Sequence, residues 1–286
     1  MSERLTLDPT YDDLEDHDRG LVFDLVTLDR RRMLQLLGFG GVSATLLTIA
    51  ACGPSGATGT AGTAAATASA AADGASSCAI IPEETAGPYP GDGSNGPNVL
   101  AESGVVRRDI RSSFGSSTTM AEGVPLTIQL TIQDGADCAP LAGAAVYLWH
   151  CDRDGNYSLY SEAVAAENYL RGVQAADDNG LVEFSSFFPA CYAGRWPHIH
   201  FEVYPSLELA TSEANRIATS QIALPQDACA TVYATDAYSQ SVTNLSQVSL
   251  TSDNVFGEDG GARQLGTVSG DVSGGYTVAL TVPVNA

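Results

Sequence analysis

The sequence predicts an all-β fold, a single β-sandwich of mostly antiparallel strands over residues 78–286. Three observations support this prediction: several short segments alternate apolar and polar residues, Gly-containing turn signals separate them, and no long amphipathic helix pattern occurs. The clearest alternation lies in residues 126–132, where every second residue is Leu or Ile and the residues between are Thr or Gln. Because side chains of a strand point alternately to opposite faces, these Leu and Ile side chains would share one buried face.

Five further segments have the composition of strands. They cover residues 144–150, 180–188, 197–204, 220–224 and 276–284. Turn signals lie at Asp134-Gly135, Asp154-Gly155, Asn179-Gly180 and Gly274-Gly275. Residues 227–234 are expected to form at most a short helix.

The first 77 residues differ from the rest in composition. Three arginines at positions 30–32 precede an apolar run over residues 34–51, a combination that resembles a twin-arginine export signal. Residues 49–52 (IAAC) resemble a lipobox, in which Cys52 would be acylated. We therefore expect an export signal in residues 1–51, a Gly/Ala/Ser/Thr-rich tether in residues 52–77, and an exported domain, either as a cell-surface lipoprotein or extracellular. The alternative is an uncleaved anchor that leaves Cys52 as an ordinary thiol.

Net charge restricts the classes of partner. The chain carries 34 acidic residues against 13 basic ones, all of them arginine, which gives a net charge of -21. Such a field repels polyanions, so we expect no nucleic-acid partner and membrane contact only through a lipid at Cys52.

Two of the four histidines, His198 and His200, lie in one predicted strand. Residues i and i+2 of a strand face the same side with Cα atoms about 6.6 Å apart, so both imidazoles can bind one metal ion. Ile199 and Phe201 would then face the core on the opposite side, and Pro197 indicates that the strand starts there or lies at an edge. The spacing alone also fits copper, zinc, or a surface pair without a ligand.

An ordered set of short motifs surrounds the histidine pair and covers most of residues 78–224. The motifs are residues 84–89 (ETAGPY), 108–110 (RDI), 145–152 (AVYLWHCD), 155–158 (GNYS), 169–172 (YLRG), 192–200 (YAGRWPHIH) and 219–222 (TSQI). In order and spacing, this set resembles the intradiol ring-cleavage dioxygenases. Catechol-specific members of that family carry a helical dimerisation segment ahead of the sandwich, whereas here the low-complexity tether occupies that place.

The resemblance implies a mononuclear, non-haem iron(III) held by four side chains: Tyr157, Tyr192, His198 and His200. Their chemistry is consistent with that metal, because two anionic phenolates favour iron(III) and imidazole completes the set. From sequence alone these two tyrosines would not stand out among the eleven in the chain.

The resemblance also implies a reaction, in which a catechol-type aromatic diol is cleaved by O2 between its two hydroxyl-bearing carbons. Tyr157 matches the ligand that substrate displaces and that takes up a substrate proton. Arg195 matches an arginine that stabilises negative charge on the ring, and Gln221 matches a glutamine beside the metal ligands. Without the resemblance, Arg195 could equally be a surface ion-pair partner.

Six cysteines fit an oxidising compartment. If Cys52 is acylated, five remain, and we expect disulfides Cys78–Cys138 and Cys191–Cys229, with Cys151 left over. Two other functions stay open at this point: a non-catalytic cell-surface binding module, and a copper or zinc protein that uses only the histidine pair.

Overall fold

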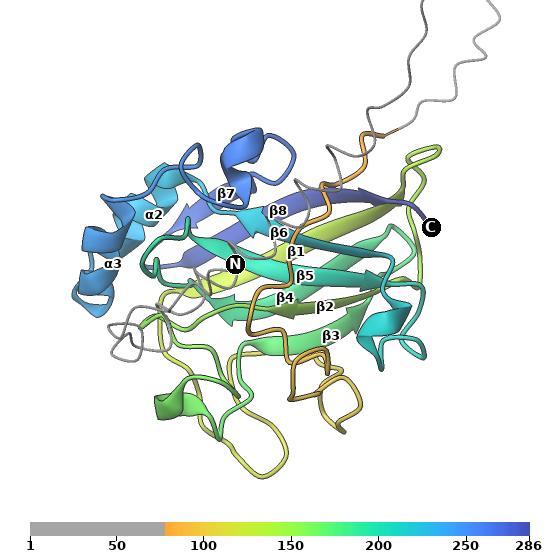
Figure 1. The fold of residues 1–286 in the computed structure, drawn as a ribbon, viewed down its shortest axis with the longest axis horizontal. Helices are drawn as coiled ribbons and strands as arrows, with labels where there is room; N and C mark the ends of the chain where they lie inside the picture. Colours follow the sequence, from red (N-terminus) through yellow and green to blue (C-terminus); the bar gives the residue numbers. More distant parts are fainter. Residues whose placement is uncertain (1–77) are drawn as a thin grey trace, which may run out of the picture.

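A computed structural model describes residues 78–286, which form two four-stranded sheets packed face to face (Figure 1). The predicted export signal, the lipid anchor at Cys52 and the tether lie outside the described residues. No helix within the described part of the chain is long and apolar enough to cross a membrane.

The first sheet has the order β4-β1-β8-β7. Its strands are β1 (Pro125–Asp134), β4 (Leu181–Phe187), β7 (Thr267–Asp271) and β8 (Gly275–Val284). Strands β1 and β8 are parallel, and the other pairs are antiparallel. Along β1 the predicted alternation is confirmed, because its Leu and Ile side chains are buried and the residues between them are only partly buried.

The second sheet has the order β3-β2-β5-β6 and is antiparallel throughout. Its strands are β2 (Ala145–Trp149), β3 (Arg171–Ala175), β5 (His198–Tyr204) and β6 (Ala218–Ala223). Strand β5 begins directly after Pro197, as predicted, but the edge position is wrong because β5 pairs with β2 on one side and β6 on the other. Proline is tolerated here because it precedes the first residue of the strand.

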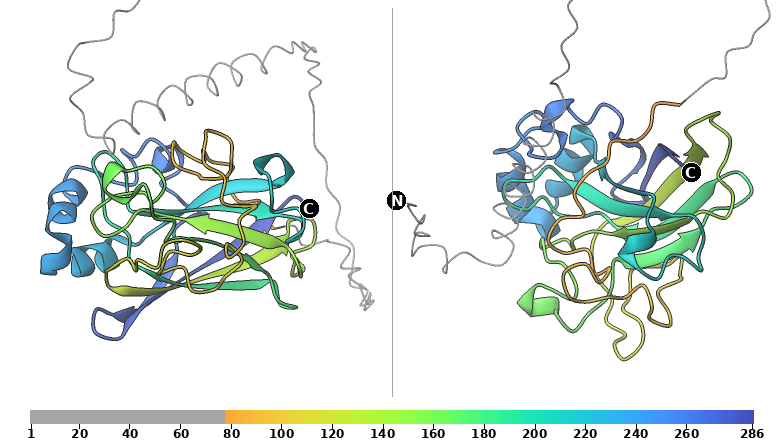
Figure 2. Two further views of the ribbon diagram at one scale, coloured as in Figure 1. Left: turned by 90° about the horizontal axis from the view of Figure 1, so that it is seen from below. Right: turned by 45° about the vertical axis from the view of Figure 1, so that its right-hand side comes forward.

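Helices α2 and α3 lie together at one end of the sandwich, opposite the C-terminus (Figures 1 and 2). Within residues 78–286 the α-helices are α2 (Gln226–Tyr233), where a short helix was expected, and α3 (Ser239–Leu245), which was not. The same part of the chain contains the 3-10 turns η2 (Glu162–Val164), η3 (Glu213–Asn215), η4 (Asp236–Tyr238) and η5 (Phe256–Glu258).

Strand β5 is buried along its whole length, on both faces. Ile199, Phe201 and Val203 pack into the core between the sheets, as the two-residue period predicts. The opposite face carries His198, His200 and Glu202 in a row, and loops rather than a second sheet cover it. The segment that follows residue 78 (orange in Figure 1) crosses this side of the sheet.

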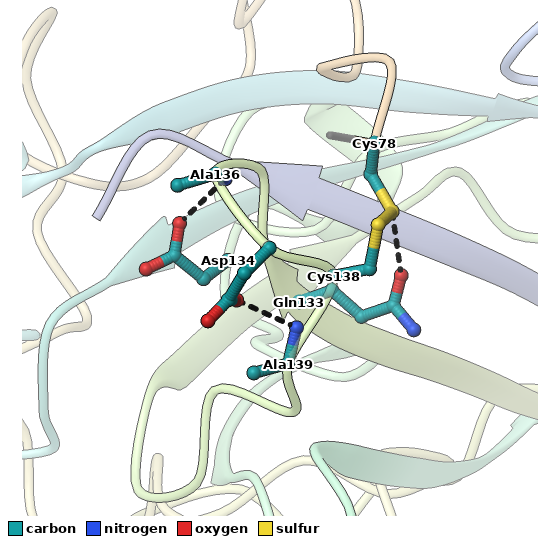
Figure 3. The surroundings of a disulfide bond; sticks show 7 residues. Cys78, Gln133, Asp134, Ala136, Cys138 and Ala139 are labelled. Atoms are coloured by element: carbon teal, nitrogen blue, oxygen red, sulfur yellow. Dashed lines mark hydrogen bonds between the residues drawn. A yellow bond between two sulfur atoms is a disulfide. The ribbon is translucent and has the colours of Figure 1, made fainter. Parts of the chain in front are cut away.

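One predicted disulfide is confirmed. Cys78 and Cys138 are bonded and close a loop with a sequence separation of 60, fixing the beginning of the described chain to the turn after β1 (Figure 3). The Cys78 backbone N–H also donates to the Gly135 carbonyl in the same turn.

The predicted Cys191–Cys229 disulfide is wrong, because Cys151, Cys191 and Cys229 are all free and buried in the described structure. The Cys191 thiol instead lies 3.5 Å from the carbonyl oxygen of Arg195, to which it donates. Burial raises the pKa of Cys191 to about 12, so the thiol stays protonated rather than forming the thiolate that disulfide exchange needs. Spacing along the sequence does not show which way the cysteine side chains point, and those directions decide which cysteines can form a disulfide.

Glu202 is a fully buried carboxyl group on the loop-covered face of β5. It accepts a 2.6 Å hydrogen bond from the Tyr204 hydroxyl, and one of its oxygens lies 3.9 Å from Arg216 Nε. Burial raises the pKa of Glu202 to about 8, and the negative charge of nearby Asp92 adds to the rise. The folded protein therefore holds a proton that the unfolded chain releases at about pH 4.3.

We predict that the Glu202→Gln substitution flattens the pH dependence of stability. In the wild type, the free energy of unfolding should fall by up to about 1.4 kcal/mol per pH unit between about pH 5 and pH 8, because only the folded state binds the Glu202 proton there. The neutral amide removes this contribution. Denaturant unfolding at several pH values should therefore show that the free energy of unfolding of the variant increases relative to that of the wild type as pH rises. Glu162→Gln, at an exposed position, controls for the loss of one carboxylate; parallel curves for wild type and Glu202→Gln would contradict the prediction.

Candidate metal centre

His198 and His200 point into one buried space above β5. Their Nε2 atoms lie 3.1 Å apart, and both residues are almost fully buried. His198 Nδ1 lies 2.5 Å from the Trp196 carbonyl oxygen, which can only accept a hydrogen bond. Nδ1 therefore carries the proton and leaves a lone pair on Nε2, the form in which imidazole binds a metal.

Two tyrosines reach the same space from loops. Tyr157 follows β2, and its hydroxyl oxygen lies 3.4 Å from His198 Nε2. Tyr192 precedes β5, and its hydroxyl oxygen lies 3.2 Å from the same nitrogen. The loops touch at Gly155, which has φ +88°, and a Cβ there would lie 3.4 Å from the Tyr192 Cβ. The structure thus brings together all four predicted metal ligands.

These four donors fit a single metal cation. The other three donor atoms lie 3.1–3.4 Å from His198 Nε2, close to the spacing of about 3.3–3.4 Å expected for ligands about 2.0–2.1 Å from a common tetrahedral centre. His200 Nδ1 is buried and has no hydrogen-bond partner within residues 78–286. Clusters of three or more His, Cys, Asp or Glu residues that could hold a metal are absent from the described chain, so the tyrosines are needed to complete this donor set.

Burial controls the protonation of the donors. It lowers the pKa of His198 and of His200 well below the ordinary value, and the positive charge of Arg195 lowers both further, so both imidazoles are neutral. Burial also raises the pKa of Tyr157 well above the ordinary value. A bound cation reverses this balance and stabilises the phenolate.

His200 is oriented by its neighbours. Trp149, its cross-strand partner on β2, stacks on the imidazole with ring centroids 4.9 Å apart and planes within 4°. On another side, Gly87 adopts φ +71°, and a Cβ there would lie 3.4 Å from His200 Cε1. The backbone of residues 84–89 therefore runs directly against the metal centre.

Arg195 and Gln221 lie beside the donors. Arg195 is 1% exposed, so the surface ion-pair interpretation is wrong, and its Nη2 donates a 2.7 Å hydrogen bond to Gln221 Oε1. Gln221 faces His200 in the β5–β6 register, and its Nε2 donates to the Thr85 carbonyl at 2.9 Å.

Sequence reasoning missed Asp253, the carboxylate that pairs with Arg195 at 3.0 Å. It lies in a loop beyond residue 224, where the motif resemblance ends, and nothing in its local sequence marks it. His150, the other histidine of the described chain, lies outside the site and contacts Ser186 and the Cys151 carbonyl.

Comparison with known proteins identifies dioxygenases that are similar to this chain. Residues 96–230 match a family model described as "Dioxygenase", and this stretch contains all six predicted site residues. This match covers less than half of the chain, and this part of the chain is similar to dioxygenases.

The individual proteins that the chain resembles are distant from it. It is 40% identical over 53 residues to chlorocatechol 1,2-dioxygenase of Rhodococcus opacus, a match that covers 18% of this chain and only 21% of the relative. The fold is similar to that of an intradiol ring-cleavage dioxygenase from Tetranychus urticae, with a TM-score of 0.57, 24% identity, and coverage of 73% of this chain and 95% of that one. At this identity the structural similarity supports the sandwich fold alone.

We predict that the His200→Ala substitution lowers metal affinity at least tenfold, since it removes one of four ligands from a preformed site. Metal analysis of the purified full-length protein after equilibration with a competing chelator measures this loss. His150→Gln, a buried histidine outside the site, should retain wild-type metal content. Equal metal content in His200→Ala and wild type would contradict the assignment.

Proposed function

We propose that this protein is an exported, non-haem iron(III) dioxygenase that cleaves a catechol-type aromatic diol between its two hydroxyl-bearing carbons with incorporation of O2. The observation that carries the proposal is the convergence of two phenol donors and one further imidazole donor within 3.4 Å of His198 Nε2. A copper or zinc site built on the histidines alone would not need the two tyrosines, so their presence favours iron(III).

Tyr157, Tyr192, His198 and His200 would hold the iron. The diol would chelate the bound iron(III) through both of its oxygens, and the metal would supply the activation that makes the ring reactive toward dioxygen. The remaining chemistry, which concerns proton transfer and charge, is derived from the protein's own residues.

Tyr157 is suited to accept a substrate proton. Burial raises the pKa of its phenol well above the ordinary value, so a Tyr157 phenolate released from a cation becomes a strong base in this environment. A diol must lose protons to bind through both oxygens, and the displaced phenolate would take up one of them.

Arg195 is suited to stabilise negative charge on the ring. Its positive charge reaches the metal ligands, since it lowers the pKa of His198, His200 and Tyr157. It is held in a buried site, where a fixed charge acts more strongly than in water. Gln221 would hold the guanidinium in place through its 2.7 Å hydrogen bond.

The substrate class rests on the donor set and on relatives. The curated relative is named for chlorocatechol, which is itself a catechol-type diol. Export and a lipid anchor at Cys52 rest on the motifs of residues 30–52, and the Cys78–Cys138 disulfide is consistent with an oxidising compartment.

Oxygen consumption by the iron-loaded, full-length protein tests this function. We predict uptake of O2 with at least one member of a panel of catechol, chlorocatechols, protocatechuate and hydroxyquinol. In ¹⁸O2 the product should be a labelled muconate-type diacid. The Arg195→Gln variant should lower kcat roughly 10²–10³-fold, the loss typical of removing a charge-stabilising donor.

Three results would refute the proposal. They are no uptake with any diol by iron-loaded protein, cleavage at a bond outside the diol, and undiminished turnover in the His200→Ala variant. The first result would favour the alternative of a non-catalytic binding module.

A further inference from the structure

Asp253 is a buried carboxylate that the motif resemblance does not reach. It lies between α3 and η5, outside the stretch matched by the family model, and its side chain is 0% exposed. A buried carboxylate needs several donors, and Asp253 has four. Three are backbone N–H groups and the fourth is Arg195 Nε.

The two oxygens of Asp253 have different partners. Oδ1 accepts hydrogen bonds from the N–H groups of Val255 and Phe256 at 2.8 and 3.0 Å, which fixes the carboxylate in its own loop. Oδ2 accepts from Arg195 Nε at 3.0 Å and from the Trp196 N–H at 2.6 Å. One carboxylate oxygen thus binds both the Arg195 side chain and the backbone of the next residue.

The Arg195 guanidinium is consequently held by hydrogen bonds on two sides. Asp253 holds Nε, and Gln221 holds Nη2 through its Oε1 atom. A planar guanidinium held at two of its nitrogens has one orientation, and Gln221 sets that orientation relative to His200, its partner across β5 and β6.

We propose that Asp253 is a positioning residue for diol cleavage: it fixes the Arg195 guanidinium beside the metal ligands. The inference rests on the proposed function, since it assigns Arg195 a role toward the substrate. Asp253 also supplies the counter-charge that a buried guanidinium requires. Without that charge, Arg195 would attract an anionic diol more strongly but hold it in a less defined place.

The Asp253→Asn substitution tests the proposal, because it removes the charge and keeps a group of nearly the same shape. We expect kcat to fall roughly tenfold to hundredfold, as for loss of a residue that supports a catalytic group, while KM stays unchanged or falls. Asp259→Asn is the matched control: Asp259 is exposed, accepts a hydrogen bond from the Gly261 N–H in the turn that follows η5, and should retain kcat within about twofold. A purely structural role would lower melting temperature and active fraction without this split between kcat and KM.

A double-mutant cycle with Arg195→Gln separates positioning from general damage. If Asp253 acts through Arg195, the Asp253→Asn substitution should lower kcat only slightly further in a protein that already carries Arg195→Gln. The proposal is overturned if Asp253→Asn turns over like Asp259→Asn, or if it lowers kcat equally in both backgrounds. Should Asp253→Asn fail to fold, Asp253→Glu replaces it, because it keeps the charge but displaces it by one methylene; wild-type kcat in that variant would also overturn the proposal.

Binding of 4-nitrocatechol to the iron-loaded protein, followed by its visible absorption, gives a readout besides turnover. Asp253→Asn should bind this anion as tightly as wild type or more tightly, and Arg195→Gln should bind it more weakly. Weaker binding by Asp253→Asn contradicts the proposal even if no diol is turned over. If the wild type binds 4-nitrocatechol but consumes no O2 with any diol, the proposed function is refuted. The affinities of the two variants for 4-nitrocatechol then decide whether Asp253 positions Arg195.

Discussion

The burial of β5 on both faces is the constraint on which the site depends. One face packs into the sandwich core, and the other presents its histidines to a space closed by loops and by the segment that follows residue 78. Because water is excluded there, the imidazoles are neutral and the Tyr157 phenol has a raised pKa. Three donor atoms that lie within 3.4 Å of a fourth, His198 Nε2, in such an environment are best satisfied by a cation.

The same burial explains the charged residues beside the donors. Arg195 can lie there only because Asp253 compensates its charge and Gln221 occupies one of its N–H groups. The three residues come from different parts of the chain: the loop before β5, the loop before η5, and β6. Their contacts therefore tie the helical end of the molecule to the metal centre.

The two-residue period of strands predicts much of this architecture. It places the Leu and Ile residues of β1 in the core and directs His198 and His200 to the face opposite Ile199. It does not identify β3 or β7, which are short edge strands, and β7 is exposed along most of its length. Tyr157 and Tyr192 could be selected only through the motif resemblance, since loop residues have no period that shows where their side chains point. The pairing of Asp253 with Arg195 and the unpaired state of Cys191 and Cys229 result from contacts between segments that are distant in the sequence. No local sequence pattern predicts such contacts.

The visible absorption spectrum of the iron-loaded, full-length protein tests the central claim most directly, namely that two tyrosines and two histidines bind iron(III). A red-brown protein is expected, with a phenolate-to-iron charge-transfer band that changes in Tyr157→Phe and in Tyr192→Phe. Tyr160→Phe should leave the band unchanged, because the Tyr160 hydroxyl binds Asn95 and the Gly91 N–H instead of facing the histidines. A colourless protein after iron loading, or a metal content and spectrum that neither Tyr157→Phe nor Tyr192→Phe alters, would contradict the claim.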